Sequence, residues 1–185
     1  DPRAYFTFYG DEASGGDTDF YCESCDGNVQ PYPFDVKGYG WKKYNRYEER
    51  ENEGVPESPI NTRVIRYADV MLMRAECMIM NGNNSGALDL INEVRARAGA
   101  EPYTDLGADP MTTLKRERRL ELCGEQVRFW DLIRWGDLVN TLNPEKQAQG
   151  EGTPVQDKHY HFPITIDELD INLEMRNDVY DPGWN

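Results

Sequence analysis

The sequence RVIRYADVMLMRAECMIMN, residues 63–81, decides what kind of fold the chain can adopt. If this stretch forms a helix, apolar side chains occur on nearly every side of it, and Gly82 can end the helix in a left-handed conformation. A helix that is apolar all round belongs in a protein core. Residues 63–81 are therefore predicted to form a buried helix, in which Cys77 is a small core residue.

Two further helical patterns follow. Ser85 can cap a second helix that carries its apolar side chains on one face, and Gly99 stops it. Asp109 followed by Pro110 is typical of a helix start, because a capping side chain precedes a first-turn proline. This third helix is predicted to run to about Cys123. The first two helices, joined by a short loop, should form a helical hairpin.

The rest of the chain is less regular. The helical pattern resumes through Trp130 to Leu138, and we interpret Trp130 as a core or packing residue. Residues 141–185 are predicted to be loop with one short helical turn. Residues 1–60 are rich in aromatic and turn-forming residues and are predicted to contain short strands and long loops. The predicted fold class is mainly α, with an aromatic-rich loop region at 1–60 and a helical region at 61–185 in one compact unit.

Composition excludes several classes of function. The chain has 185 residues, with 20 basic against 34 acidic side chains and a formal net charge of −14. This acidity disfavours binding to nucleic acid and to anionic bilayers, both of which need a clustered cationic surface. No stretch approaches the ~20 apolar residues of a membrane-spanning helix. The first residues lack the pattern of a signal peptide, and we expect the chain to be a fragment of a longer protein.

Three carboxylates could serve a glycosidase, but their neighbours favour a structural role. Glu117 and Glu121 lie four residues apart, on one helix face, and Asp131 lies in the next helical pattern. Each has arginine within one helical turn, a spacing that favours ion pairs. The nearby arginines are Arg118, Arg119, Arg128 and Arg134. The chain also lacks the common nucleophile and phosphate-binding motifs, so no catalytic residue is predicted.

No metal site or cofactor is predicted either. An acidic loop could hold a structural calcium ion, although its spacing does not match an EF-hand and a solvated loop is the simpler interpretation. Its acids are Asp17, Asp19, Glu23 and Asp26. Cys22 and Cys25 form a C-x-x-C pair without a second pair to complete a zinc site. They are interpreted as a short-loop disulfide or two free thiols.

Aromatic side chains in the loops are the best candidates for ligand binding. The predicted ligand-binding residues are Trp41, Tyr39, Tyr32 and Tyr21, which stand among Gly, Pro and Asp. A flat aromatic ring can bury the C–H face of a sugar while polar neighbours bond its hydroxyl groups. Alternatively, these rings fasten the loops to the helices.

Four blocks in collinear order resemble one family. They are RYADVMLMRAE, ALDLINEVRARAGA, LKRERRLELCGEQVRFWDLIRWGDL and HYHFPITIDELDINLEMRND, with DPR and WKKY upstream. Together they resemble the C-terminal portion of the SusD/RagB family, surface glycan-binding lipoproteins of Bacteroidota-type outer membranes. The resemblance implies a helical, tetratricopeptide-like core and a lipid anchor in a segment outside this chain. It also implies a TonB-dependent, SusC-like transporter as partner.

The leading hypothesis is a non-catalytic protein on the outer-membrane surface that captures oligosaccharides, or sometimes peptides, and delivers them to that transporter. Two alternatives stay open at this point. One is a fragment of a glycoside hydrolase or lyase, and the other is a helical-repeat scaffold that binds only proteins.

Overall fold

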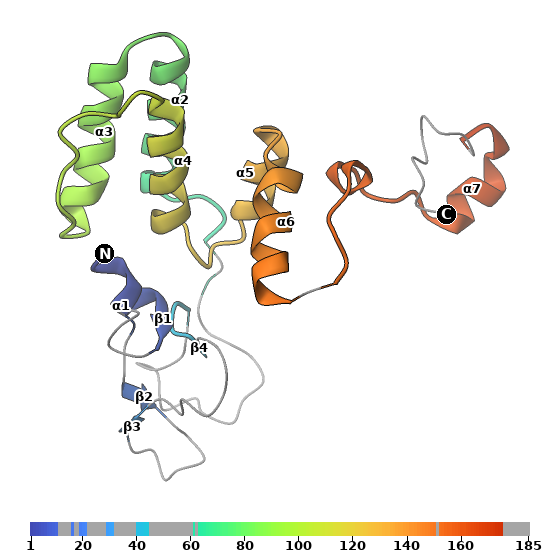
Figure 1. Cartoon of the computed structure of the whole chain (residues 1–185), viewed down its shortest axis with the longest axis horizontal. Coiled ribbons are helices and arrows are strands. Elements are labelled where there is room, and N and C mark those ends of the chain that lie inside the picture. The colour runs from blue at the N-terminus through green and yellow to red at the C-terminus, as the bar shows by residue number, and fades with distance from the viewer. Residues whose placement is uncertain are drawn as a thin grey trace. The chain divides into compact units, whose positions relative to one another are not determined.

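The computed structural model describes residues 1–10, 16, 40–44, 61, 63–150 and 152–175, together with the backbone of two short strands, Asp19–Tyr21 and Val29–Pro31. The chain divides into two compact units, 1–126 and 127–185 (Figure 1). The boundary predicted near residue 60 lies outside the described residues.

Three helices form the centre of the first unit. They are α2 (Tyr67–Met80), α3 (Asn84–Arg97) and α4 (Pro110–Glu121), and they lie side by side (Figure 1). Leucine, isoleucine and small apolar side chains fill the space between them. The core residues are Met71, Leu72, Ala75, Ala87, Ile91, Val94, Leu106 and Leu114. The mainly helical fold and the α2–α3 hairpin predicted from the sequence are confirmed.

The helix starts follow from side-chain caps. Asp109 caps α4 as predicted, because its carboxylate accepts a hydrogen bond from the backbone N–H of Met111 at 3.1 Å. The cap predicted for α3 was wrong. Asn83, not Ser85, caps this helix by accepting a hydrogen bond from the N–H of Gly86 at 3.0 Å. Ser85 instead lies inside the first turn.

Helix α2 is amphipathic rather than buried all round. Leu72 and Ala75 are completely buried, whereas Tyr67 is 74% exposed and Cys77 is exposed too. The prediction of a buried helix with a core Cys77 is therefore wrong for the part of the chain that the structure describes. The physical reason is that α3 and α4 cover the same side of α2, which leaves the other side open.

The described part of residues 1–60 contains short strands, as predicted, and one short helix that the sequence did not predict. Helix α1 (Arg3–Thr7) leads into β1 (Phe8–Tyr9), which pairs antiparallel with β4 (Gly40–Trp41) in the register Phe8 to Trp41. The backbone N–H groups of Lys42 and Lys43 both donate to the carbonyl of Thr7 at 3.1 Å. Strands β2 (Asp19–Tyr21) and β3 (Val29–Pro31) form a second antiparallel pair.

The second unit contains a helix that the sequence did not predict. Its elements are α5 (Arg128–Arg134), α6 (Leu138–Gln149), η4 (Asp157–Tyr160), α7 (Ile166–Ile171) and η5 (Leu173–Met175). Residues 141–149 of helix α6 were predicted as loop, because a proline inside a helical pattern, here Pro144, normally indicates a break. The amide of Asn143 bonds both backbone groups of Val155, at 2.9 and 2.6 Å, and so holds the following loop against the helix.

None of the helices in the described ranges is both long enough and apolar enough to cross a membrane.

The packing of α2 gives the first prediction. Leu72→Gln should lower the free energy of unfolding of the chain by about 3 kcal/mol, because it buries an unsatisfied amide in the core. Met80→Gln is the matched control. Met80 ends the same helix with 76% of its surface exposed, so its substitution should change the free energy by less than about 0.5 kcal/mol. Chemical denaturation measures both values, and equal losses for the two variants would contradict the assigned core.

Candidate functional site

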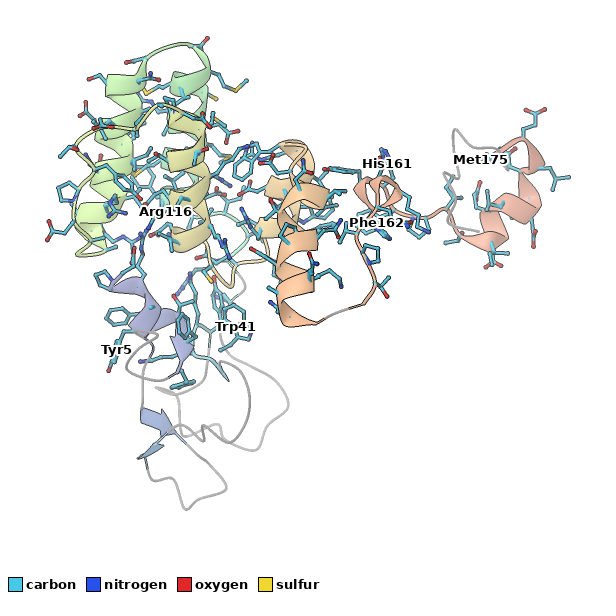
Figure 2. The ribbon with its side chains drawn as sticks, viewed as in Figure 1. Tyr5, Trp41, Arg116, His161, Phe162 and Met175 are labelled. Carbon is cyan, nitrogen blue, oxygen red and sulfur yellow. The ribbon has the colours of Figure 1, made fainter. Side chains whose placement is uncertain are left out.

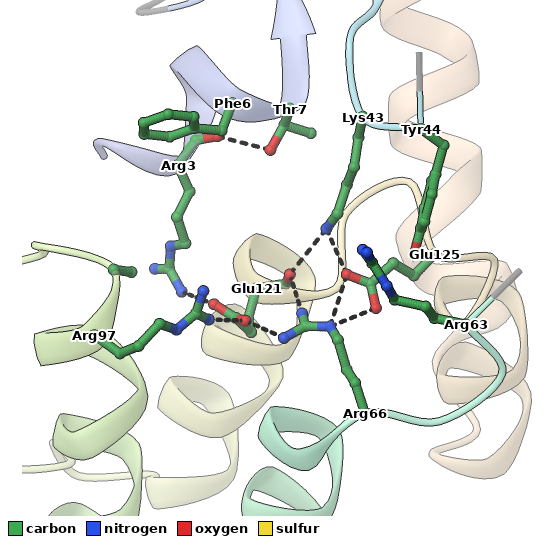
Figure 3. Close-up of a pocket in the computed structure, with 11 residues that line it drawn as sticks. Arg3, Phe6, Thr7, Lys43, Tyr44, Arg63, Arg66, Arg97, Glu121 and Glu125 are labelled. Atoms are coloured by element: carbon green, nitrogen blue, oxygen red, sulfur yellow. Dashed lines mark hydrogen bonds and ion pairs between the residues drawn. The ribbon is translucent and has the colours of Figure 1, made fainter. Parts of the chain in front are cut away.

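A pocket opens in the first unit at the end of the three-helix core (Figure 3). Its volume of about 320 Å³ is at the lower end of the range for small-molecule sites. Charged side chains dominate its wall. The lining residues are Arg3, Phe6, Thr7, Lys43, Tyr44, Arg63, Arg66, Arg97, Ala98, Glu121 and Glu125.

Three arginines share the carboxylate of Glu121 at the bottom of this pocket. Arg3 Nη1 lies 3.1 Å from one oxygen, Oε2, and Arg66 and Arg97 both bond the other oxygen, Oε1. Arg66 and Arg97 both point at Glu121 in the close-up (Figure 3). The Glu121 side chain is only 2% exposed. Such a buried carboxylate is stable because several charge-assisted hydrogen bonds surround it.

Two further carboxylates on or just after α4 extend the network, and Asp1 pairs with Arg3 at 2.7 Å. Glu125 accepts hydrogen bonds from Arg66 Nε at 2.9 and 2.7 Å, and it also bonds Lys43 Nζ. Glu117, which is fully buried, pairs with Arg3 at 2.6 Å and with Arg95 at 2.8 Å. The cations therefore come from α1, from the turn after β4, from the residues before α2 and from α3. The network binds these elements to α4.

Positive charge exceeds negative charge in the pocket. Five of its lining residues are cationic and two are acidic. Among the described residues, Arg63 has no carboxylate partner, and its guanidinium lies 5.9 Å from the centre of the Tyr44 ring. Tyr44 itself has a φ of 65°, a left-handed conformation that is costly for an aromatic residue and that often occurs at functional sites. The result is a cationic pocket in an acidic chain.

The pKa values of the pocket groups follow from these contacts. Burial raises the pKa of Glu125, but hydrogen bonds from Arg66 and Lys43 outweigh it, so the pKa lies below its usual value. Burial lowers the pKa of Arg66, but its bonds to Glu125 and Glu121 outweigh that effect and raise it overall. Arg3 behaves in the same way through Glu117 and Glu121. The ion pairs thus dominate over desolvation.

The acids considered as catalytic candidates are ion-paired, as predicted, but mostly with other partners. Asp131 pairs with Arg134 at 2.9 Å, as expected from their spacing. Glu121, however, takes its partners from distant elements. Arg118 extends instead to Asp69 of α2, at 2.9 Å. Spacing along one helix does not determine such a choice, because a helix from another part of the fold can offer a better-placed acid.

Of the four aromatic residues predicted to bind ligand, the structure describes one side chain. Trp41 is 63% exposed on β4, and its Cζ3 atom lies 3.1 Å from the position that a Cβ would take on Gly124 (Figure 2 marks Trp41). Tyr39 and Tyr32 lie outside the described residues, and only the backbone of Tyr21 is described, at the end of β2. The role of all four stays a prediction.

Sequence reasoning missed most of the pocket. Phe6, which is 67% exposed, and the arginines carry no local motif. Arg3 and Glu121 are 118 positions apart, and a contact at that separation has no signal in a single sequence. The juxtaposition is a product of the tertiary fold.

A separate aromatic cluster lies on the second unit. Trp130 is 55% exposed, so it is not a core residue, although it packs against neighbouring rings. It contacts Phe129, at 5.6 Å between ring centres, and Phe162, at 5.8 Å. Phe162 is 69% exposed and is marked in Figure 2. Trp130 thus provides a second exposed indole against which Trp41 can be compared.

No cluster of potential metal ligands occurs in the described part of the chain. Three residues of the acidic loop, Asp17, Glu23 and Asp26, lie outside that part, and Asp19 is described only by its backbone. Cys22 and Cys25 also lie outside it. The calcium and disulfide interpretations stay untested.

The lowered pKa of Glu125 predicts an acid-dependent stability. A carboxylate whose folded-state pKa is depressed stabilises the fold above its unfolded value, near 4.3, and this stabilisation is lost as pH falls through the folded-state value. Glu125→Gln should therefore be less stable than the parent at pH 7, and the difference should shrink below about pH 4. Chemical denaturation at several pH values measures this difference.

The exposed Glu93 of α3 offers a control, because Glu93→Gln should follow the parent at every pH. A constant difference between Glu125→Gln and the parent over the acid range would refute the role given to this ion pair.

Comparison with known proteins places the chain in a family. The SusD family model matches residues 1–184. SusD-like protein P25 of Formosa agariphila is 36% identical over 131 residues, which are 67% of this chain and 25% of that protein. The chain therefore spans about a quarter of this relative's length.

Solved structures agree. A SusD superfamily protein from Bacteroides vulgatus has a TM-score of 0.66 and 29% identity, covering 94% of this chain and 38% of its own. A laminarin-binding SusD-like protein has a TM-score of 0.56 and 30% identity. The match covers 82% of this chain and 32% of that protein. These similarities confirm the predicted SusD-like fold. The chain belongs to the SusD family.

Proposed function

We propose that the chain is part of a non-catalytic protein that captures oligosaccharides at the cell surface. The observation that carries this proposal is Trp41, an exposed indole on a strand that leads directly into the wall of a polar pocket. Its backbone is fixed by pairing with β1, and Gly124 lies close to the ring. An aromatic face held in place beside hydrogen-bonding groups is the combination that a hydrated sugar requires.

The expected affinity is modest. A sugar ring that covers roughly 100 Å² of the indole gains about 2.5 kcal/mol at 25 cal/mol/Å² before ordering costs. Donors at the pocket, such as Arg63 and Arg97, can add hydrogen bonds to hydroxyl groups. Together these contacts favour dissociation constants between about 1 mM and 1 μM. Such values suit a protein that concentrates nutrients at a surface.

The carboxylates favour capture over hydrolysis. A glycosidase needs one protonated carboxylic acid and one free carboxylate on either side of the scissile bond. Glu117 and Glu121 instead are buried in pairs with arginines, and Asp131 is paired with Arg134. These contacts support a non-catalytic role. The hydrolase alternative has no corresponding support from the described residues.

The family supplies support for the wider context. We propose, from membership of the SusD family, that the whole protein is held at the outer-membrane surface and delivers its ligand to a TonB-dependent transporter. The name of the laminarin-binding relative supports an oligosaccharide as ligand. Co-purification with a large outer-membrane barrel tests the partner. A soluble protein that never co-purifies with one would favour the scaffold alternative.

Binding measurements test the role of Trp41. Trp41→Ala should raise the dissociation constant for the cognate oligosaccharide at least about 10-fold, a loss of about 1.4 kcal/mol, because the stacking surface is removed. Trp130→Ala is the matched control, since it removes an indole of similar exposure from the second unit. Calorimetry on the full chain with a panel of oligosaccharides measures both, alongside an assay of depolymerisation.

If Trp130→Ala weakens binding and Trp41→Ala does not, the ligand site belongs to the second unit. If a glycan is depolymerised and Glu121→Gln abolishes the turnover of still-folded protein, the enzyme alternative replaces capture.

A further inference from the structure

The ion pairs of the pocket leave positive charge unsatisfied. Arg3 pairs with Asp1 and Glu117 as well as with Glu121. Its charge is therefore balanced, whereas Arg66, Arg97 and Lys43 share the two carboxylates of Glu121 and Glu125. Arg63 has no carboxylate partner among the described residues. A cavity with such an excess favours an anion, because the field of several fixed cations adds up where solvent is partly excluded.

We propose that this pocket binds the carboxylate or sulfate group of an acidic sugar, with Arg63 and Arg97 as its direct ligands. The proposal rests on the proposed function, in that it names the chemical class of glycan that the protein captures. An anionic glycan is a narrower class than oligosaccharides in general, and the excess of positive charge is what selects it.

Arg63 and Arg97 are the two arginines that remain available. Arg97 has a side chain that is 60% exposed and makes one ion pair, with Glu121. Arg63 is exposed at the mouth of the pocket beside Tyr44 (Figure 3). The planar guanidinium group can donate two parallel hydrogen bonds to a carboxylate or a sulfate. By contrast, Arg66 is already occupied by Glu121 and Glu125.

The buried network prepares the pocket for an anion. Arg66 holds both carboxylates in place, and the backbone carbonyl of Glu121 accepts a further hydrogen bond from Arg66 Nη2 at 2.7 Å. Because these groups are fixed before binding, little conformational entropy is lost when the ligand arrives. Only the exposed ends of Arg63 and Arg97 need to become ordered.

A sugar acid fits the surroundings better than a free inorganic anion. Phe6 lines the pocket and exposes 67% of its surface, and the ring of Tyr44 forms another part of the wall. These apolar surfaces can pack against the C–H face of a pyranose while its charged substituent lies between the arginines. A free sulfate ion would make only the polar contacts. The sugar ring should therefore add affinity.

Three probes with the same ring test the assignment. Galactose, galacturonate and galactose 6-sulfate are titrated into the full chain at constant ionic strength, and the side-chain Nε–H signals of its arginines are followed by NMR. The two charged probes should shift the Arg63 signal with saturation and bind at least about 10-fold more tightly than galactose. Inorganic sulfate should bind more weakly than galactose 6-sulfate.

Two variants assign the effect to the pocket. Arg63→Gln should reduce the affinity for both charged probes at least about 10-fold. It breaks no ion pair among the described residues, so the fold should stay intact. Arg116→Gln is the control, because Arg116 is an exposed arginine of α4 outside the pocket (Figure 2), and it should change nothing.

Other outcomes overturn the proposal. If the charged probes bind no better than galactose, the pocket is not an anion site. If Arg63→Gln and Arg116→Gln lose equal affinity, the binding is due to general surface charge. If inorganic sulfate binds as tightly as galactose 6-sulfate, the assignment to a sugar is wrong. The proposed capture function can fail independently of the anion site. It is tested by the binding of neutral oligosaccharides to Trp41→Ala, in which no anion takes part.

Discussion

Three carboxylates along α4 and its C-terminal turn hold the first unit together. Glu117 and Glu121 are buried, and with Glu125 they bind cations from α1, from the turn after β4 and from the segments around α2 and α3. Each carboxylate would be costly to bury alone, and each arginine equally so. Because they occur together, the desolvation cost is offset by several short charge-assisted hydrogen bonds, and elements far apart in sequence share one anchor.

The pocket is a consequence of that anchor. The same contacts that fix α1 against the helices place Phe6 and Lys43 on the pocket wall, and β1 pairs with the strand that carries Trp41. Arg97, which shares Glu121 with two other arginines, is exposed to solvent. Arg63, which has no carboxylate partner among the described residues, is exposed beside the network. In this way a structural requirement of a SusD-family chain produces a surface with the properties of an anion-binding site.

Local signals predicted much of the fold. Asp109 and Pro110 fixed the start of α4, and the apolar periodicity of α2 and α3 predicted their hairpin. Helix α6 was not fully predicted, because Pro144 inside it normally indicates a break. The helix is nevertheless held in the fold by the hydrogen bond between Asn143 and Val155. The sequence also overestimated the burial of α2, since periodicity shows that a residue is apolar but not which neighbour covers it.

The site was less predictable than the fold. Trp41 could be proposed from the composition of its loop, whereas no spacing rule connects Arg3 or Arg97 with Glu121. Even an arginine on the same helix can form its ion pair elsewhere, because Arg118 pairs with Asp69 of α2. Ion pairs within one helix turn can be read from a sequence. Networks that converge from several elements depend on the finished packing.

A double-mutant cycle between Arg3 and Glu117 tests the anchoring role of α4 most directly. Arg3→Gln, Glu117→Gln and the double variant of the full chain are compared with the parent by chemical denaturation. The 2.6 Å pair, buried on both sides, predicts a coupling free energy of at least about 1.5 kcal/mol. If the losses of unfolding free energy in the two single variants add up to the loss in the double variant within about 0.3 kcal/mol, the two residues act independently. That result would contradict the anchoring role of α4.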